Sequence, residues 1–378
     1  PDLVGVALAG GSLDSFKNLA GIKPPPRVSI VDTPATVDTG EMTVRLRLED
    51  QGGGLGDVRI YLNGTAVVMD SPDGTGTGVR VREYDLKLAE GDNTITAVAF
   101  NSDNTMRSNP AVLEVAADFA APRKASLYAL VVGVNEFKNP ALRLNYPVAD
   151  AELFAGTLAR GAKGLFKTVD IRQRVAPAET TSAAILDELA SMKSLRPEDL
   201  FVFYIASHGT VDDGQYFLIT SNVGSLRTEK LKTDAISQGM LTAAIANIPA
   251  TKKLIIIDTC NAGALGEAIQ VAVMTRGLSE DTALKILSRA VGSTILSAST
   301  SRQEALEGYQ GHGLFTYVLA EGLSGKADPG GTGYVKTTAL ADYVDNEVPL
   351  LAEKVFQRAQ YPTISISGQA FPIGRARN

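Results

Sequence analysis

The sequence predicts an all-β sandwich followed by a mostly parallel α/β sheet flanked by helices. Residues 27–117 hold short apolar segments separated by turn residues at intervals of about ten positions, which is typical of a sandwich. From residue 127 onward, apolar runs alternate with helical patterns, the order expected of a parallel sheet. Proline-containing stretches precede both regions, at Pro24–Pro26 and within 118–126.

We therefore divide the chain into an N-terminal segment with a proline-rich linker (1–26), an immunoglobulin-like β-sandwich (27–117), a linker (118–126) and an α/β domain (127–378). In the sandwich, apolar and charged residues alternate over 44–49, which predicts a strand with one buried face. Asn63-Gly64 predicts a two-residue hairpin. The expected strands cover 44–48, 58–62, 66–68, 79–88, 94–100 and 111–115.

In the α/β region, apolar runs predict buried strands, and amphipathic segments predict the helices between them. The expected strands are 128–134, 169–171, 200–208, 253–260 and 293–297, with a hairpin around 216–219. The expected helices are 149–158, 182–192, 239–246, 314–323 and 343–356, and the tail is expected to be extended.

The composition is that of an ordinary globular protein, with 44% hydrophobic and 21% charged residues in 378. A formal charge of −6 argues against nucleic acid as a partner, and no apolar run reaches the about 18–20 residues of a membrane helix. A single cysteine excludes an internal disulfide and permits a reducing compartment without proving one; the localisation stays open, with the cytoplasm favoured. The chain starts at Pro1, so we expect a fragment or a processed form whose targeting signal cannot be assessed.

His208 and Cys260 are each the first reactive group after a predicted buried strand. In open α/β sheets the functional crevice lies beyond the carboxyl ends of the strands, so both groups are expected there. An imidazole near its ordinary pKa can take a thiol proton and later return it to a leaving amine. Backbone NH groups of Gly209 and Cys260 are expected to hold the developing oxyanion. A free cysteine alone is more often buried and inert, but the pairing favours catalysis.

Ser207-His208-Gly209, followed about 50 residues later by Asp258-Thr259-Cys260-Asn261-Ala262-Gly263, resembles the caspase-like cysteine peptidases. The similarity covers roughly 126–374, including Gly313-Leu314-Phe315-Thr316, and is closer to bacterial caspase homologues and metacaspases than to animal caspases. It implies a mostly parallel six-stranded sheet and peptide cleavage through a thioacyl intermediate. In that scheme His208 is the general base and acid, Cys260 the nucleophile, and Gly209 with Cys260 the oxyanion hole.

Strand alternation points Asp258 the same way as Cys260, where a carboxylate suits a pocket for a basic side chain; the alternative is a helix cap. Metacaspases cleave after Arg or Lys with this aspartate and one in the first helix, which matches Asp150. Glu304 or Glu307 is a further candidate, although an exposed helical charge is the simpler interpretation of either. Ala206 departs from the serine that metacaspases often carry two residues before the histidine.

The 261–292 segment corresponds to the linker between the subunits of caspase-like enzymes. A peptidase selective for basic residues is expected to cut itself there, at Arg276, Lys285 or Arg289, with Arg276 beside a glycine favoured. The alternative for 278–290 is an amphipathic helix.

No cofactor is expected. The acidic residues with which many metacaspases bind calcium are missing from 218–222 and 235–238, and one cysteine with two histidines makes structural zinc improbable. His312 is the rival base, but it precedes a helix and is expected in a loop near the cleft. The expected partners are protein or peptide substrates with Arg or Lys at the cleaved bond, with no nucleic acid and no membrane. We expect a monomer, with the sandwich docked on the peptidase domain.

Two other functions compete with an Arg/Lys endopeptidase. One is a catalytically idle caspase-like module that binds partners, with the sandwich as an adhesive domain; the intact dyad argues against it. The other is the same protease with a preference for Asp or small residues, for which the sequence shows no basic pocket.

Overall fold

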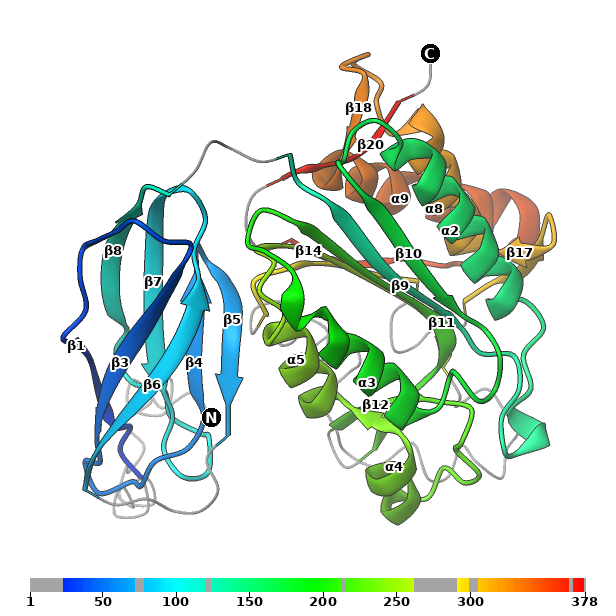
Figure 1. Ribbon diagram of the computed structural model, residues 1–378. Helices are drawn as coiled ribbons and strands as arrows, with labels where there is room; N and C mark the ends of the chain where they lie inside the picture. Colours follow the sequence, from blue (N-terminus) through cyan, green and yellow to red (C-terminus); the bar gives the residue numbers. More distant parts are fainter. Residues whose placement is uncertain are drawn as a thin grey trace, which may run out of the picture.

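The computed structural model describes residues 23–71, 78–119, 124–212, 215–261, 291–298, 305–366 and 370–376, apart from the side chains of Cys260 and Asn261. Figure 1 shows two regions, a β-sandwich in blue and cyan and a larger α/β region in green to red. Both regions have the architecture that the sequence predicts.

The sandwich consists of two sheets that enclose an apolar core. One sheet has the order β1-β3-β6, from β1 (Arg27–Val31), β3 (Glu41–Glu49) and β6 (Val79–Lys87). The other has the order β2-β8-β7-β4-β5, from β2 (Thr36–Val37), β8 (Ala111–Ala117), β7 (Gly91–Ala99), β4 (Val58–Leu62) and β5 (Thr65–Asp70). Val44, Leu46 and Leu48 are fully buried between them while their neighbours in β3 are exposed, so the predicted alternation is confirmed.

The predicted hairpin at Asn63-Gly64 joins β4 to β5. Both turn residues have positive φ, 52° at Asn63 and 84° at Gly64, and Leu62 pairs with Thr65. Two consecutive left-handed residues are what a two-residue turn needs to match the twist of its strands.

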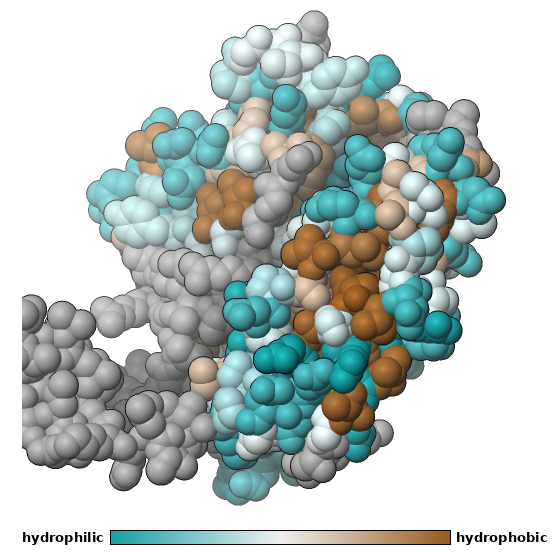
Figure 2. All heavy atoms as spheres, turned by 90° about the vertical axis from the view of Figure 1, so that its left-hand side faces the viewer, coloured by the Kyte–Doolittle hydropathy of each residue, from teal (hydrophilic) through white to brown (hydrophobic). Residues whose placement is uncertain are grey.

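The surface of the sandwich is mostly polar. Figure 2 looks at the molecule from the sandwich side and shows hydrophilic residues around one elongated apolar strip. In the described part of the sandwich, the large apolar side chains that remain exposed are Val79, Val81, Met106, Val112 and Phe119.

The main sheet of the α/β region has the strand order β10-β9-β11-β14-β15-β19, with only β19 antiparallel to its neighbour. The strands are β9 (Leu127–Gly133), β10 (Val169–Arg174), β11 (Leu200–Asp212), β14 (Lys252–Asn261), β15 (Thr294–Ser297) and β19 (Thr363–Ser365). β12 (Gln215–Ile219) folds back antiparallel on β11 and pairs with β13 (Ile236–Ser237). Six strands, mostly parallel, agree with the expected fold.

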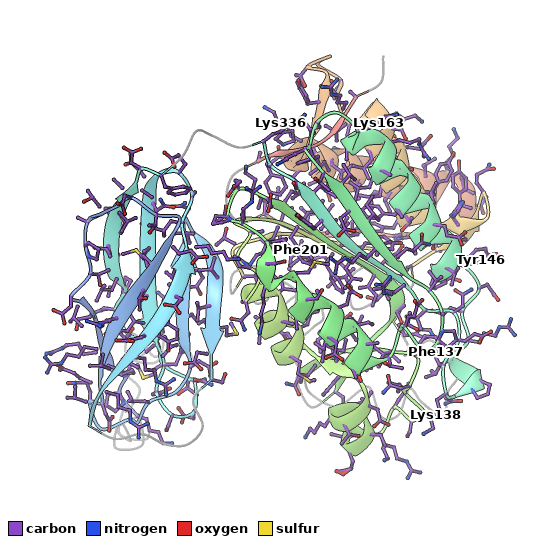
Figure 3. All side chains as sticks on the ribbon, in the orientation of Figure 1. Phe137, Lys138, Tyr146, Lys163, Phe201 and Lys336 are labelled. Atoms are coloured by element: carbon purple, nitrogen blue, oxygen red, sulfur yellow. The ribbon has the colours of Figure 1, made fainter. Side chains whose placement is uncertain are left out.

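Helices cover both faces of this sheet (Figure 1). α2 (Pro147–Ala162), α8 (Leu314–Glu321) and α9 (Thr337–Leu351) pack on one face, against alternate strand residues such as Val202 and Ile256. α3 (Ser182–Ser191), α4 (Thr228–Asp234) and α5 (Gln238–Ala246) pack on the other, against residues such as Phe203 and Ile255. The buried strand residues therefore supply two cores, and Figure 3 shows side chains filling both faces of the sheet.

Short elements complete the chain: the helical turns η3 (Pro140–Leu142), η4 (Met192–Ser194), η6 (Gly322–Lys326) and η7 (Ala352–Phe356), and the strands β16 (Glu307–Tyr309), β17 (His312–Gly313), β18 (Tyr334–Lys336) and β20 (Pro372–Arg375). α9 begins six residues before the predicted helix over 343–356, at a polar Thr-Thr that showed no apolar periodicity.

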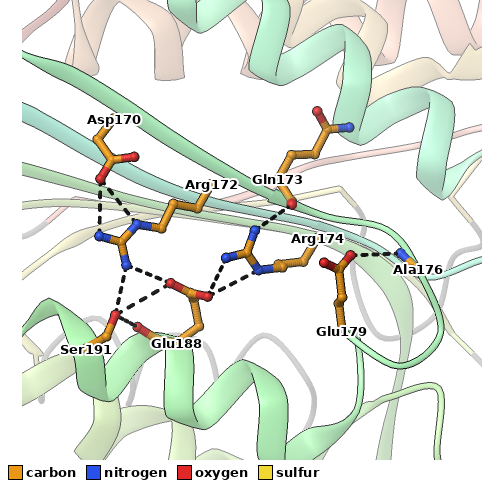
Figure 4. Close-up of polar contacts among 8 residues, drawn as sticks. All are labelled: Asp170, Arg172, Gln173, Arg174, Ala176, Glu179, Glu188 and Ser191. Carbon is orange, nitrogen blue, oxygen red and sulfur yellow. Dashed lines mark hydrogen bonds and ion pairs between the residues drawn. The ribbon is translucent and has the colours of Figure 1, made fainter.

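α3 is fastened to edge strand β10 by a charged cluster (Figure 4). Glu188 accepts from Arg172 at 2.7 Å and from Arg174 at 2.6 Å, and Asp170 also pairs with Arg172 at 3.2 Å. Because two arginines share one glutamate, the cluster fixes the position of α3 along the strand.

Candidate active site

β11 and β14 place His208 and Cys260 next to each other. The two strands run parallel, and His208 is the direct register partner of Cys260. Neighbouring strands lie about 4.8 Å apart, and residues at the same register project toward the same face. The side chain of Cys260 lies outside the described residues, but its backbone position is at the carboxyl edge of the sheet, as expected.

His208 is held in one orientation. The side chain is buried, its ring lies 5.3 Å from that of Phe137, and its Nε2 is 2.9 Å from the carbonyl oxygen of Leu142. A carbonyl can only accept, so Nε2 carries a proton and donates it. In the neutral ring the lone pair is then on Nδ1, the nitrogen that can act as a base.

Gly209 must be glycine because β12 covers it. A Cβ at this position would lie 2.6 Å from the hydroxyl oxygen of Tyr216 and 2.8–3.0 Å from its ring carbons. Gly209 is also the register partner of Asn261, so its backbone continues the edge formed by His208 and Cys260. The strand expected over 200–208 runs four residues further, since β11 ends at Asp212.

Asp150 and Asp258 come together beside this edge. Asp150 lies in the first turn of α2 and is 3% exposed; Asp258 lies on β14, two residues before Cys260, and is 7% exposed. The NH of Gly313 donates to both oxygens of Asp150, at 3.0 Å and 3.2 Å. A Cβ placed on Gly313 would lie 3.0 Å from Oδ2 of Asp150 and 3.7 Å from Oδ2 of Asp258, so both carboxylates border the same small volume.

A close approach of α2 to the end of β9 sets the position of Asp150. A Cβ on Gly133 would lie 2.4 Å from the carbonyl oxygen of Pro147, so glycine is required for the helix to begin there. On the neighbouring strand, Ala206 is the register partner of Asp258 and is buried.

Two residues that the sequence did not point to, Thr316 and Tyr204, hold Asp258 in place. Thr316 of α8 donates to Oδ2 of Asp258 at 2.5 Å, and the hydroxyl of Tyr204 lies 2.6 Å from Oγ1 of Thr316. Because the single proton of Thr316 goes to Asp258, the Tyr204 hydroxyl is the donor in the second contact. The signal that could have found them was a hydroxyl in each of two otherwise apolar segments.

Burial and neighbouring negative charges raise the pKa values of both carboxylates. The pKa of Asp150 is raised to about 8, first by burial, then by the charges of Asp258 and Glu307, against the stabilising Gly313 hydrogen bond. The pKa of Asp258 is raised to about 6, mainly by burial, with its bond from Thr316 opposing the change. Within the described residues, neither carboxylate has a lysine or arginine partner. Such a pair favours an external cation.

Glu307 and His312 also border this pocket. The expectation of an exposed helical charge is wrong for Glu307, which lies in strand β16, and its charge raises the pKa of both aspartates. Glu304 lies outside the described residues. Nδ1 of His312 is 3.1 Å from Oδ1 of Asp150, and burial lowers the pKa of this histidine. His312 therefore belongs to the carboxylate pocket, in the short strand β17.

The self-cleavage candidates Arg276, Lys285 and Arg289 lie outside the described residues. In the part of the chain that the structure covers, no group of three or more His, Cys, Asp or Glu side chains is arranged to hold a metal ion. No helix among the described residues has both the length and the apolar character needed to cross a membrane.

Comparison with known proteins identifies the α/β region. The family model of the caspase domain matches residues 126–370. No curated protein matches the chain. Solved structures similar to it include a Geobacter sulfurreducens protein (TM-score 0.43, 17% identity, 65% of this chain and 94% of that one) and caspase-1 from Spodoptera frugiperda (TM-score 0.41, 14% identity, 68% and 93%). The fibronectin(III)-like modules of CbhA from Clostridium thermocellum are similar to a shorter part (TM-score 0.21, 18% identity, 25% and 99%).

The fold and the family match define a cysteine-type peptidase. The chain belongs to the caspase domain family, whose model covers well over half of its length.

Proposed function

We propose that this protein is a cysteine endopeptidase that cleaves after Arg or Lys. The observation that carries the proposal is the pair Asp150 and Asp258, two buried carboxylates beside the His208–Cys260 edge that have no lysine or arginine partner among the described residues. Leaving such groups in a dry pocket is unfavourable, and a basic substrate side chain relieves it.

In the proposed mechanism, Nδ1 of His208 takes the proton of the Cys260 thiol, and the sulfur attacks the substrate carbonyl carbon. The backbone NH groups of Gly209 and Cys260 stabilise the oxyanion. The imidazolium then donates its proton to the leaving amine, and the C–N bond breaks to give a thioacyl enzyme. His208 next accepts a proton from water, the resulting hydroxide displaces the sulfur, and the acid product leaves.

The substrate side chain before the cleaved bond places its cation between Asp150 and Asp258. A guanidinium has a planar fork that can serve two carboxylates at once, whereas an ammonium acts as a point charge. We therefore expect Arg to be preferred over Lys. Glu307 adds negative charge to the site and does not have to contact the substrate.

We further propose self-cleavage at Arg276, Lys285 or Arg289 and activity that is independent of calcium. The purified enzyme is expected to yield fragments ending at one of these residues, in the presence of a calcium chelator. A Cys260→Ala protein is expected to stay intact under the same conditions. Fragments that appear only after calcium is added would contradict the second proposal.

The decisive experiment is turnover of a fluorogenic arginyl-amide substrate. Cys260→Ala and His208→Ala are expected to abolish turnover, and Asp258→Asn to weaken it while folding is retained. Absence of turnover in correctly folded protein would favour an idle interaction module. Turnover of aspartyl or alanyl substrates in a peptide library, with none of arginyl ones, would overturn the Arg/Lys preference.

For the sandwich we propose docking on the peptidase domain within one monomer. Lys87 of β6 donates to the carbonyl oxygens of Lys193 and Leu195 at 3.1 Å and 3.3 Å, which supports such an arrangement. A truncated chain that begins at Ser126 is expected to be less soluble than the full protein. Unchanged solubility and rate would refute the proposal.

A further inference from the structure

The β4–β5 hairpin of the sandwich contacts two segments of the peptidase domain that are far apart in the sequence. Thr65, the first residue of β5, is 3% exposed, and its Oγ1 lies 2.8 Å from the carbonyl oxygen of Thr251 and 3.3 Å from that of Gly292. Its single hydroxyl proton is shared between both acceptors. One side chain thus joins the chain before β14 to the chain before β15.

Backbones meet without intervening side chains at the second of these segments. Gly292 has a φ of 67°, and a Cβ there would lie 2.2 Å from the carbonyl oxygen of Gly64 and 2.9 Å from Cα of Thr65. Glycine is therefore required both by the conformation and by the contact. This approach allows Thr65 to reach the Gly292 carbonyl.

A buried lysine fastens the first segment to the same hairpin. Lys253, the second residue of β14, is 1% exposed, and its Nζ donates to the carbonyl oxygens of Ala66 at 2.8 Å, Ile245 at 2.9 Å and Ala246 at 3.3 Å. Three acceptors satisfy the three protons of an ammonium group, while burial lowers its pKa well below the usual value. Ala66 belongs to the sandwich, so the shell is complete only with the sandwich in place.

Edge strand β5 continues the contact along helix α5. Asn247, which follows α5, accepts from the backbone NH of Met69 at 2.9 Å and donates to its carbonyl oxygen at 3.3 Å. The side-chain amide thereby uses both backbone groups of one residue on the open edge of the strand. Such pairing blunts an edge that would otherwise invite another strand.

All these contacts lie at the end of the sheet opposite the reactive edge. Cys260 lies seven positions after Lys253 along β14, which corresponds to about 23 Å. The hairpin therefore does not cover the His208–Cys260 edge. It lies instead at the start of β14 and at the approach to β15, whereas residues 262–290 connect the carboxyl end of β14 to that approach in the sequence.

We propose that the β4–β5 hairpin is a clamp that holds the start of β14 and the approach to β15 together, and that it adds to the β14–β15 pairing in keeping the two fragments joined after a cut between them. Its biological use rests on the proposed self-cleavage of the 261–292 segment. The clamp itself is independent of that activity, because its contacts are present in the uncut chain.

The test uses full-length Cys260→Ala protein that carries the recognition sequence of an unrelated, site-specific protease after Gly277. After cutting, the fragments are expected to elute as one species. Thr65→Val is expected to lower the midpoint of thermal unfolding of the cut protein by about 2–4 °C more than that of the uncut protein. Thr65→Ser, which keeps the hydroxyl, is expected to behave as the parent.

Lys87→Ala is the matched control, since Lys87 contacts the carbonyl oxygens of Lys193 and Leu195 and none of the residues that the hairpin joins. Lys87→Ala is expected to shift the midpoint of thermal unfolding of the cut and the uncut protein equally. The clamp would be overturned if Thr65→Val also shifted the unfolding midpoints of cut and uncut protein equally. It would likewise be overturned if the fragments separated while the hairpin is unaltered. If the native enzyme were inactive, the proposed function would be contradicted. The test of the clamp would still hold, because an unrelated protease makes the cut.

Discussion

Asp150 and Asp258 border one small volume although a helix presents one and a strand the other: a carbon placed at the Cβ position of Gly313 would lie 3.0 Å and 3.7 Å from their Oδ2 atoms. Burial and the charge of Asp258 oppose ionisation of Asp150, whose pKa is raised to about 8. A cation placed between the two carboxylates is expected to displace the proton of Asp150, and this proton release can be measured.

Asp150→Asn is expected to lower kcat/KM for an arginyl substrate by at least about 30-fold, because one partner of a buried charge pair is lost. The effect should appear mainly in KM if the carboxylate binds substrate and transition state alike. Steady-state kinetics measure it. Glu152→Gln, an exposed carboxylate of the same helix, is the control and should be near wild type. An equal loss in both variants would contradict a local role.

Binding of a cation is expected to strengthen as pH rises from 6 to 8. The pKa of Asp150 is about 8 and that of Asp258 about 6, so a guanidinium must expel a proton over this range. Affinity should rise by up to about tenfold per pH unit while one proton leaves. Calorimetry of N-acetylagmatine with Cys260→Ala protein, in two buffers of different ionisation enthalpy, counts the protons. A pH-independent affinity would rule the linkage out.

Asp150→Asn is also expected to stabilise the protein at alkaline pH. The pKa of Asp150 is about 8 when folded and about 3.9 when unfolded, so its ionisation removes stability as pH rises between these values. The amide does not ionise. The unfolding midpoint of the variant relative to wild type should therefore be higher at pH 9 than at pH 5, and a constant difference would show that burial does not hold the proton on Asp150.

Thr316→Val is expected to raise KM for arginyl substrates and move the pH dependence upward. The Thr316 hydrogen bond opposes the increase in the pKa of Asp258, so removing it makes the carboxylate harder to ionise. It also removes the Thr316 oxygen that accepts from the Tyr204 hydroxyl. Thr316→Ser keeps the hydroxyl and should restore both the KM and the pH profile, which a packing defect alone would not do.

Gly209→Ala is expected to reduce activity strongly, since its Cβ would lie 2.6 Å from the Tyr216 hydroxyl oxygen and displace the backbone beside His208. Gly239→Ala is the control. Gly239 lies in helix α5, and the nearest atom to its Cβ, Oγ of Ser237, would be 3.9 Å away. Gly239→Ala should leave the activity unchanged and stabilise the folded protein slightly. Full activity of Gly209→Ala would show that the edge tolerates movement.

The sequence predicted the strands and helices because periodicity is local, and it placed His208 and Cys260 together because both end buried runs. Strand alternation predicted that the side chain of Asp258 points the same way as that of Cys260. Thr316 and Tyr204 could not be paired from sequence, since their contact depends on how α8 lies across the sheet. Glu307 was assigned to a helix because the Gly308–Gly311 turn that makes β16 and β17 a hairpin has no alternating pattern around it.

The contacts between the sandwich and the peptidase domain could not be predicted from the sequence either. Most of their acceptors are backbone carbonyl oxygens, which any residue supplies. The one signal was Lys253 at a buried position of an apolar strand, next to the exposed Lys252. A cation on the dry face of a strand requires partners from outside the sheet.

Tyr204 is fully buried and stacks on Phe154, with ring centroids 4.5 Å apart, while its hydroxyl supports Thr316. Under the proposed specificity, a core residue therefore also supports a substrate-binding group. Replacing Asp258 by a residue that cannot accept a hydrogen bond would leave the buried Thr316 hydroxyl without its carboxylate acceptor. A change in the proposed preference would therefore require compensating changes in the core.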